Sequence, residues 1–272
     1  MAGERVARLV NRNNLLNENK AAVLNRFPQS HCESRREPLC DYLANGAFVS
    51  STQLRRFGEV GLTAAQLADG GVVTGTVMGE AFHALVLEPE VFATQYLVLA
   101  ESHSGQAAIP EDQVMQRQWL DAWQWSALLH GRDALLACGP VPDWLSAGRK
   151  ELSIYWSDAD GAQWKARPDC FTTDIVLDLK TTNDCRPQAF GRTRDRFGYD
   201  LQAAHYIDAV ARLTGTMPRF AFLAVELKAP YSVWIHELGA SELAAARRQL
   251  DELRSSYIAA SEAASGFASA AR

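Results

Sequence analysis

Residues 165–180 have the sequence Lys-Ala-Arg-Pro-Asp-Cys-Phe-Thr-Thr-Asp-Ile-Val-Leu-Asp-Leu-Lys, which sets acidic and basic residues around a short apolar run. The β-branched and apolar residues 175–177 predict a buried strand. Because side chains alternate across a strand, Asp178 and Lys180 project to one face while Leu179 points into the core. The stretch therefore predicts a carboxylate and an ammonium group together at the end of a buried strand.

A second carboxylate is expected beside this pair. A preceding strand over Trp164–Asp169, joined through a polar turn at Thr172–Asp174, brings Asp169 alongside Asp178 in a β-hairpin. Mg²⁺ prefers oxygen ligands and usually takes one or two protein carboxylates. A nearby ammonium group can orient the attacking water or stabilise charge on a phosphate. The pattern indicates a phosphodiester-cleaving site; the alternative is an exposed strand with a local ion pair.

A helix is predicted over residues 199–213, ending at Gly215, because its apolar residues follow helical spacing. Gln202 and Tyr206 lie four residues apart and therefore share one face of this helix. The functional interpretation places both at the site. The alternative is an ordinary amphipathic helix with a half-buried tyrosine.

Two further residues become relevant only if the fold brings them to the carboxylates. His83 belongs to the sequence Gly79-x-x-x-His83 in a predicted helix that runs from about residue 74 to Leu87. Glu151 precedes a strand expected to pair with Trp164–Asp169 through a turn at residues 158–161. The alternatives are a core or surface histidine and a solvated carboxylate at a strand end.

The order of these segments is Gly-x-x-x-His, Glu, Lys-x-Arg-Pro-Asp, Asp-Leu-Lys-Thr-Thr and Gln-x-x-x-Tyr. It resembles the exonuclease VIII (RecE-type) nuclease domain, in the RecB-like branch of the PD-(D/E)xK nucleases. The resemblance covers roughly Phe48 to Leu238, and the tract Gly79–Phe92 is also similar. It implies a restriction-endonuclease-like core.

The resemblance also implies roles for the matching residues. The metal ligands would be His83, Asp169, Asp178 and the backbone carbonyl of Leu179, with Glu151 as a weaker match. Together with Asp169 and Asp178, Lys180 would be catalytic. Gln202 and Tyr206 would lie at the same site and help hold DNA or the catalytic groups.

The activity that the resemblance implies is Mg²⁺-dependent digestion of linear double-stranded DNA from its ends, in the 5′-to-3′ direction, with Mn²⁺ as a substitute. A 3′ single strand would remain, as in phage recombination. The resemblance further implies a ring-shaped homo-oligomer, a trimer or tetramer, and a RecT-type partner that anneals single strands. The alternatives are an endonuclease of repair or defence with the same fold, and a nuclease-fold protein that binds DNA or protein without cutting.

The net charge of −5 and the pI of about 5.7 are unusual for a DNA-binding protein, because phosphate contacts supply much of the affinity. Charge can be local, however. Four arginines between the Asp-Leu-Lys strand and the Gln-x-x-x-Tyr helix are candidates for contacts with the DNA backbone: Arg186, Arg192, Arg194 and Arg196. The alternative is a solvated loop, partly neutralised by its own aspartates.

The remaining composition bounds the class of protein. The 272 residues are 47% hydrophobic, which is enough for a large core. No apolar stretch approaches the roughly 20 residues of a bilayer span, and the N-terminus lacks an apolar signal core, so we expect a cytoplasmic protein without a membrane partner. The five scattered cysteines argue against a disulfide framework. In the RecB-like nucleases that hold an iron–sulfur cluster, a group of cysteines follows the Gln-x-x-x-Tyr helix. Because no cysteine follows Cys185, the resemblance implies no cluster here.

The coarse order of elements is helices, three strands, a helix, two strands and a helix, which predicts an α/β domain with a central mixed β-sheet flanked by helices. We expect a partly irregular N-terminal arm over 1–45, the nuclease domain over 46–262 and a flexible tail over 263–272. Loops are expected at Gly70-Gly71 and at 101–110. Helices at 111–137 carry three tryptophans that could stack bases, although helical spacing favours a core role: Trp119, Trp123 and Trp125.

Overall fold

The computed structural model describes residues 31–61, 76–99 and 117–270, with the side chains of 265–270 left aside. Its largest sheet has the order β10-β9-β8-β7-β4. The strands are β4 (Arg149–Lys150), β7 (Cys170–Phe171), β8 (Ile175–Thr181), β9 (Arg219–Val225) and β10 (Val233–Glu237). Strands β8 and β9 are parallel and the other pairs are antiparallel. The predicted mixed sheet is therefore confirmed.

A second, three-stranded sheet has the order β1-β5-β6. It consists of β1 (Cys32–Arg35), β5 (Ser153–Ser157) and β6 (Gln163–Ala166). The expected pairing of β5 with the following strand is confirmed. The single strand expected over Trp164–Asp169 is wrong, because β6 ends at Ala166 and the chain crosses to the larger sheet before β7 begins. Pro168 explains the break, since proline has no N–H to donate to a sheet.

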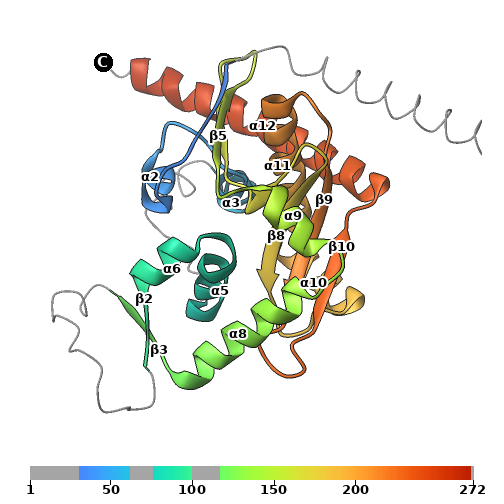
Figure 1. The fold of residues 1–272 in the computed structure, drawn as a ribbon. Coiled ribbons are helices and arrows are strands. Elements are labelled where there is room, and N and C mark those ends of the chain that lie inside the picture. The colour runs from blue at the N-terminus through green and yellow to red at the C-terminus, as the bar shows by residue number, and fades with distance from the viewer. Residues whose placement is uncertain (1–30, 62–75, 100–116, 271–272) are drawn as a thin grey trace, which may run out of the picture.

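Helices cover both faces of the five-stranded sheet. One face packs against α5 (Val77–Leu87), α6 (Pro89–Gln95), α8 (Ala122–Leu136) and α9 (Val141–Ala147). The other packs against α3 (Ser51–Val60), α10 (Pro187–Phe197), α11 (Tyr199–Thr214) and α12 (Ala240–Ala270). Figure 1 shows α11 and α12 together in the upper part of the view and α5, α6 and α8 in the lower part.

The alternation of side chains along β8 divides the core between these two layers. Val176 belongs to the cluster with α11, whereas Ile175, Leu177 and Leu179 belong to the cluster with α5. Leu179 is buried, as predicted from the period of two. Strand β8 therefore presents its even-numbered residues, including Asp178, to the α11 layer.

The segments at the two ends of the described chain carry more regular structure than expected. Residues 31–45 are not an irregular arm, because β1 pairs with the edge of β5 and α2 (Leu39–Ala44) follows it. The tail is helical through Ala270, since α12 continues beyond the expected end near residue 260. The remaining expectations, for 1–30, Gly70-Gly71, 101–110, the start of the 111–137 helices and 271–272, lie outside the described residues.

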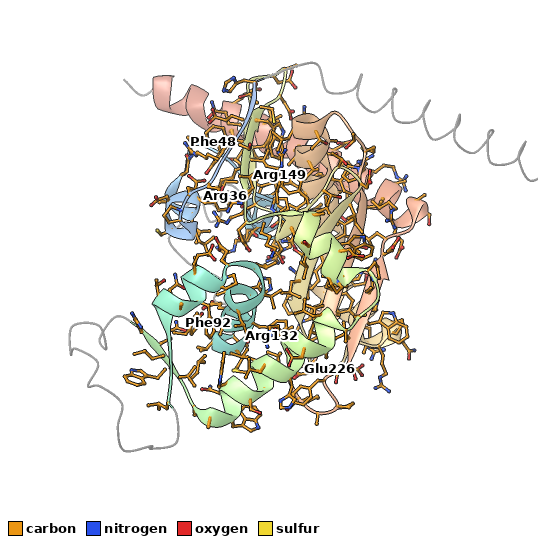
Figure 2. The ribbon with its side chains drawn as sticks, in the orientation of Figure 1. Arg36, Phe48, Phe92, Arg132, Arg149 and Glu226 are labelled. Carbon is orange, nitrogen blue, oxygen red and sulfur yellow. The ribbon has the colours of Figure 1, made fainter. Side chains whose placement is uncertain are left out.

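The tryptophan segment also differs from its prediction. Trp119 lies in the short strand β3 (Gln118–Leu120), which pairs in parallel with β2 (Tyr96–Val98), and helix α8 begins only after the Asp121 cap. Trp119 is 43% exposed and Trp123 66% exposed, so the core assignment is wrong for both. Trp125 is partly buried and stacks 5.6 Å from Phe92, a residue labelled in Figure 2.

Within the described residues, no helix is both long enough and apolar enough for a bilayer span.

Candidate nuclease site

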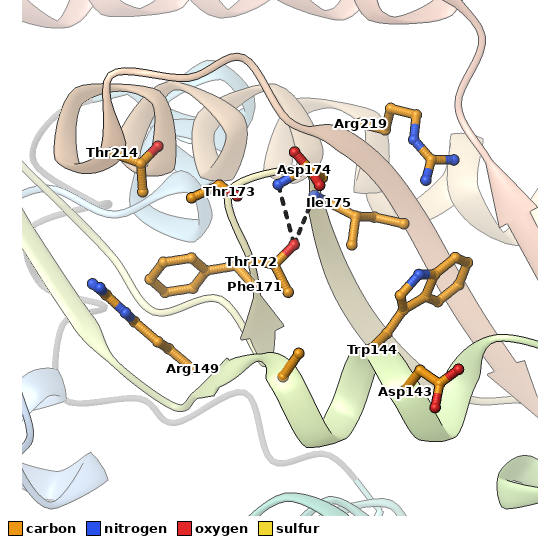
Figure 3. Close-up of a pocket in the computed structure, with 11 residues that line it drawn as sticks. Asp143, Trp144, Arg149, Phe171, Thr172, Thr173, Asp174, Ile175, Thr214 and Arg219 are labelled. Atoms are coloured by element: carbon orange, nitrogen blue, oxygen red, sulfur yellow. Dashed lines mark hydrogen bonds between the residues drawn. The ribbon is translucent and has the colours of Figure 1, made fainter.

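The predicted turn at residues 172–174 is present, but it joins β8 to β7 rather than to a strand over Trp164–Asp169, and this hairpin holds one carboxylate at its base. The turn between β7 and β8 is fixed by Thr172, whose Oγ1 accepts the N–H groups of Asp174 at 3.1 Å and Ile175 at 3.2 Å (Figure 3). At the other end of the hairpin, the N–H of Leu179 donates to Asp169 Oδ2 over 2.6 Å. Asp169 is thereby fixed beside the end of β8, as the sequence predicted.

The second carboxylate belongs to Asp178, which is fully buried. Its Oδ2 lies 2.6 Å from Lys180 Nζ, and its Oδ1 makes no hydrogen bond to any described residue. Burial, opposed by the Lys180 ammonium and reinforced by the charge of Asp169, raises the pKa of Asp178 to about 6. A buried carboxylate oxygen without a donor is costly unless a cation or a proton joins it.

Lys180 connects the strand to helix α11. Its Nζ donates to Gln202 Oε1 over 3.3 Å, and Gln202 Nε2 donates to the hydroxyl of Tyr206 over 2.9 Å. Burial alone would lower the pKa of Lys180, but the charges of Asp178 and Asp169 outweigh it and the pKa is raised. The lysine is therefore an ammonium group at neutral pH, held at the site between its carboxylate and the predicted Gln–Tyr pair.

His83 reaches the site because α5 approaches β8 closely at Gly79. A Cβ at Gly79 would lie 3.0 Å from Thr181 Oγ1, which is closer than most side-chain contacts. One turn further along α5, His83 Nδ1 lies 3.6 Å from Asp169 Oδ2. Burial, followed by the Lys180 charge, lowers the pKa of His83 to about 4, so the ring is neutral at neutral pH and available as a ligand.

Glu151 lies between β4 and β5 rather than in a strand, and its backbone φ is +48°. A positive φ at a residue other than glycine costs conformational energy and is often found at functional sites. Its N–H donates to the backbone carbonyl of Asp169 over 3.1 Å. Burial, then the neighbouring Asp169 charge, raises the pKa of Glu151.

Three of the predicted ligands form one group. One ligand atom each from His83, Glu151 and Asp169 lies within 4.8 Å of the other two. Asp178 is not part of this group, and its Oδ2 lies 2.6 Å from Lys180 Nζ. The structure thus places Glu151, the weakest of the sequence matches, in the ligand group and leaves Asp178 outside it.

Arg167 is a site residue to which the sequence reasoning gave no role. This buried guanidinium donates to Glu151 Oε2 over 2.7 Å and to Ser153 Oγ over 3.2 Å, and it lies 3.7 Å from Glu88 Oε1. It therefore orients Glu151 toward Asp169. The available signal was its place in Lys165–Asp169, the segment that also supplies Asp169.

The four candidate arginines do not form a loop. Three of them, Arg192, Arg194 and Arg196, lie in α10, and Arg186 is its N-cap. Arg194 forms ion pairs with Asp200 and Glu242, both at 2.8 Å, and Arg186 pairs with Asp184 at 2.6 Å. Arg192 and Arg196 are exposed, and Arg196 lines the cleft described next. Arg186 and Arg194 thus form ion pairs, and Arg186, Arg192 and Arg196 are exposed.

A cleft with a volume of about 1540 Å³ opens over the site. His83, Glu151, Lys180 and Gln202 line it, and Arg36 contributes from the connection between β1 and α2 (Figure 2). A smaller hollow of about 570 Å³ lies at the opposite end of β8, around Thr172–Ile175 (Figure 3). It contains none of the predicted catalytic residues, so the larger cleft is the candidate substrate site.

A family model described as "PDDEXK-like domain of unknown function (DUF3799)" matches residues 51–266. The chain belongs to this family. The match covers the two carboxylates, the lysine and the Gln–Tyr helix. It supports the PD-(D/E)xK superfamily and does not single out the RecE type.

A similar solved structure is described as "Putative exonuclease" from Eubacterium rectale. Its TM-score to this chain is 0.59 at 15% sequence identity, and the alignment covers 84% of this chain and 88% of the other. At this identity the likeness supports the fold, including the restriction-endonuclease-like core. A search of curated proteins gives no match.

Proposed function

We propose that this protein is a metal-dependent DNA exonuclease that hydrolyses phosphodiester bonds from the ends of linear duplexes in the 5′-to-3′ direction. One observation carries the nuclease assignment. His83, Glu151 and Asp169 converge within 4.8 Å of one another, next to the Asp178–Lys180 pair, in the wall of a large cleft. Membership of a PDDEXK-like family supports the same class of chemistry.

The residues present fit a divalent cation. The buried Asp178 Oδ1 has no donor among the described residues, and burial raises the pKa values of the Glu151 and Asp169 carboxyl groups. Carboxylate oxygens suit Mg²⁺, and one imidazole is also accepted by Mn²⁺. His83, Glu151 and Asp169 would hold the ion, with Asp178 and the Leu179 carbonyl as neighbouring donors. A bound ion would polarise the phosphate and lower the pKa of a water.

Lys180 places a positive charge of the protein itself at the cleft wall, in addition to the charge of a bound cation. Because its ammonium group is held by Asp178 and Gln202, it has a defined position at the cleft wall. A preorganised charge of this kind stabilises negative charge on a phosphate without reorganising during the reaction. Gln202 and Tyr206 fix the lysine and so act as positioning residues.

The contacts with DNA are proposed for the exposed basic residues of the cleft. Arg196 and Arg36 line it, and both lie outside the carboxylate group. Positive charge at these positions would attract the phosphate backbone although the net charge of the chain is −5. Arg192 is exposed on the same helix and would extend the contact, whereas the salt-bridged Arg186 and Arg194 would contribute less.

Polarity, a 3′ single-stranded product, a ring-shaped oligomer and a RecT-type annealing partner remain proposals that rest on the resemblance to the exonuclease VIII domain. The description of the Eubacterium rectale protein as an exonuclease agrees with digestion from ends.

A time course on linear and covalently closed circular duplexes tests the proposal. With Mg²⁺ we expect loss of the linear DNA only, and Asp178→Ala and Lys180→Met should each abolish it. Asp174→Ala is the matched control, because this exposed aspartate lies at the other end of the same hairpin. Labels at the 5′ and 3′ ends would report polarity.

Two outcomes would replace the proposal. Cleavage of the circular duplex would assign the protein as an endonuclease of the same fold. If linear, nicked and single-stranded substrates all stay intact with Mg²⁺ and with Mn²⁺, the chain is a binding protein that has kept the nuclease fold.

A further inference from the structure

A short segment between helices α10 and α11 places aromatic rings beside the catalytic lysine. Gly198 ends α10 and begins α11, with a left-handed φ of +62°. A Cβ at this position would lie 2.9 Å from Arg55 Cδ, so the left-handed turn also packs closely against the Arg55 side chain of α3. The turn carries Phe197 and Tyr199 on its two sides, and both line the cleft.

Tyr199 is the fixed member of this aromatic pair. Lys180 Nζ lies 4.6 Å from the centroid of its ring, and the ring of Phe222 lies 5.9 Å away. The residue is partly buried against the core cluster under α11. Tyr199 therefore couples the position of the aromatic pair to that of the lysine.

Phe197 stacks on this fixed ring. The two centroids are 5.6 Å apart and the ring planes differ by 20°. Phe197 nevertheless remains 44% exposed, so one face of its ring is free of the core. An exposed ring held in a fixed orientation at the wall of a substrate cleft is suited to stacking.

Arg196 adds positive charge at the same place. Its guanidinium carbon lies 5.3 Å from the centroid of the Phe197 ring, and the ion pairs found among the described residues do not include it. Its neighbour Arg194, by contrast, is held by two carboxylates. A guanidinium beside an exposed aromatic ring can contact a phosphate while the ring contacts the attached base.

We propose that Phe197 is the stacking platform for an unpaired nucleobase of the strand whose phosphate lies at Lys180. The bases of a duplex are stacked on each other and offer no free face along its length, whereas an unpaired base does. The cleft would thus bind the cleaved strand in single-stranded form, separated from its complement at the site. This inference rests on the proposed nuclease function and adds the form of the substrate to it.

The test measures binding in an Asp178→Ala background, so that cleavage does not interfere. A short single-stranded oligonucleotide should bind roughly 5- to 150-fold more weakly when Phe197→Ala is added, the range expected for loss of one base–aromatic stack. Phe197→Trp should retain the affinity. Trp123→Ala is the matched control, because it removes an exposed aromatic side chain from α8, outside the cleft.

Two further ligands separate stacking from other causes. An oligonucleotide of the same length without bases should bind the parent and Phe197→Ala equally, since it offers nothing to stack. A covalently closed circular duplex, which has no end to separate, should lose less than twofold. Equal losses for the normal and baseless oligonucleotides, an equal loss for the closed duplex, or no loss at all would each overturn the proposal.

The binding measurements are independent of activity. If the wild-type protein cuts no DNA, the proposed nuclease function fails while the stacking measurements still decide the role of Phe197. If the wild type cuts linear DNA and Phe197→Ala binds and cuts as the parent does, the stacking proposal alone is wrong.

Discussion

Replacing Asp178 by asparagine removes the buried charge but keeps the shape of the side chain. The change therefore measures how much the charge of this proposed catalytic carboxylate destabilises the fold. The pKa of Asp178 rises from 3.8 to about 6 on folding, chiefly because the side chain is buried. A group with a raised pKa in the folded protein contributes its full stability below pH 4 and loses it as the pH rises through about 6. Above that pH the metal-free protein carries an unfavourable buried charge.

The size of this effect follows from the same values. A pKa difference of about two is worth about 3 kcal/mol, at about 1.4 kcal/mol for each tenfold change in proton affinity. Asparagine has nearly the same shape but no charge to bury. It leaves Lys180 without its closest counterion, which offsets part of the gain. We expect a net stabilisation of about 1–3 kcal/mol at pH 8 without metal.

Urea unfolding of both proteins in EDTA, at pH 5 and at pH 8, measures this difference. The advantage of Asp178→Asn should be larger at pH 8 and should shrink when Mg²⁺ is added, because the ion stabilises the wild type by binding to it. Asp174→Asn, an exposed change on the same hairpin, should have no comparable effect. A variant that is less stable than the wild type at pH 8 in EDTA would refute the reasoning.

Two other substitutions test the framework around the site. Arg254 is 6% exposed and lies 2.9 Å from the buried Asp208. Arg254→Ala should destabilise the protein by about 1–3 kcal/mol, because Arg247, 3.5 Å from the same carboxylate, compensates its charge only in part. The exposed Arg248→Ala on the same helix should be nearly neutral in urea unfolding. Gly198→Ala should cost about 1–2 kcal/mol and weaken binding of single-stranded DNA, because the left-handed turn and the adjacent arginine exclude a side chain. Gly191→Ala, in the open interior of α10, should instead stabilise the protein by about 0.5–1 kcal/mol. If Gly198→Ala proved no less stable than Gly191→Ala, the assigned role of the turn would be wrong.

The parts of the site that could be predicted are those set by local periodicity. The alternation in β8 put Asp178 and Lys180 on one face, and the four-residue spacing in α11 put Gln202 and Tyr206 on another. Both patterns repeat within a few residues and need no knowledge of distant contacts. The C-terminal end of α11 at Gly215 was predictable for the same reason.

The parts that could not be predicted depend on contacts between distant segments. The pairing of β1 with β5 joins residues more than a hundred positions apart, so a short polar stretch near the N-terminus gave no sign of it. The clamp of Arg167 on Glu151 and Glu88 likewise requires three separate elements to meet. The exposure of Trp123 followed from where α8 begins, which the spacing of tryptophans did not show.

The crossing between the two sheets has a consequence for how activity arises during folding. Arg167, Pro168 and Asp169 leave the three-stranded sheet at β6 and enter the five-stranded sheet at β7. Under the proposed function, a chain in which one sheet has formed and the other has not lacks the full ligand group. Under that proposal, cleavage of nucleic acid requires the two sheets to be joined through this crossing.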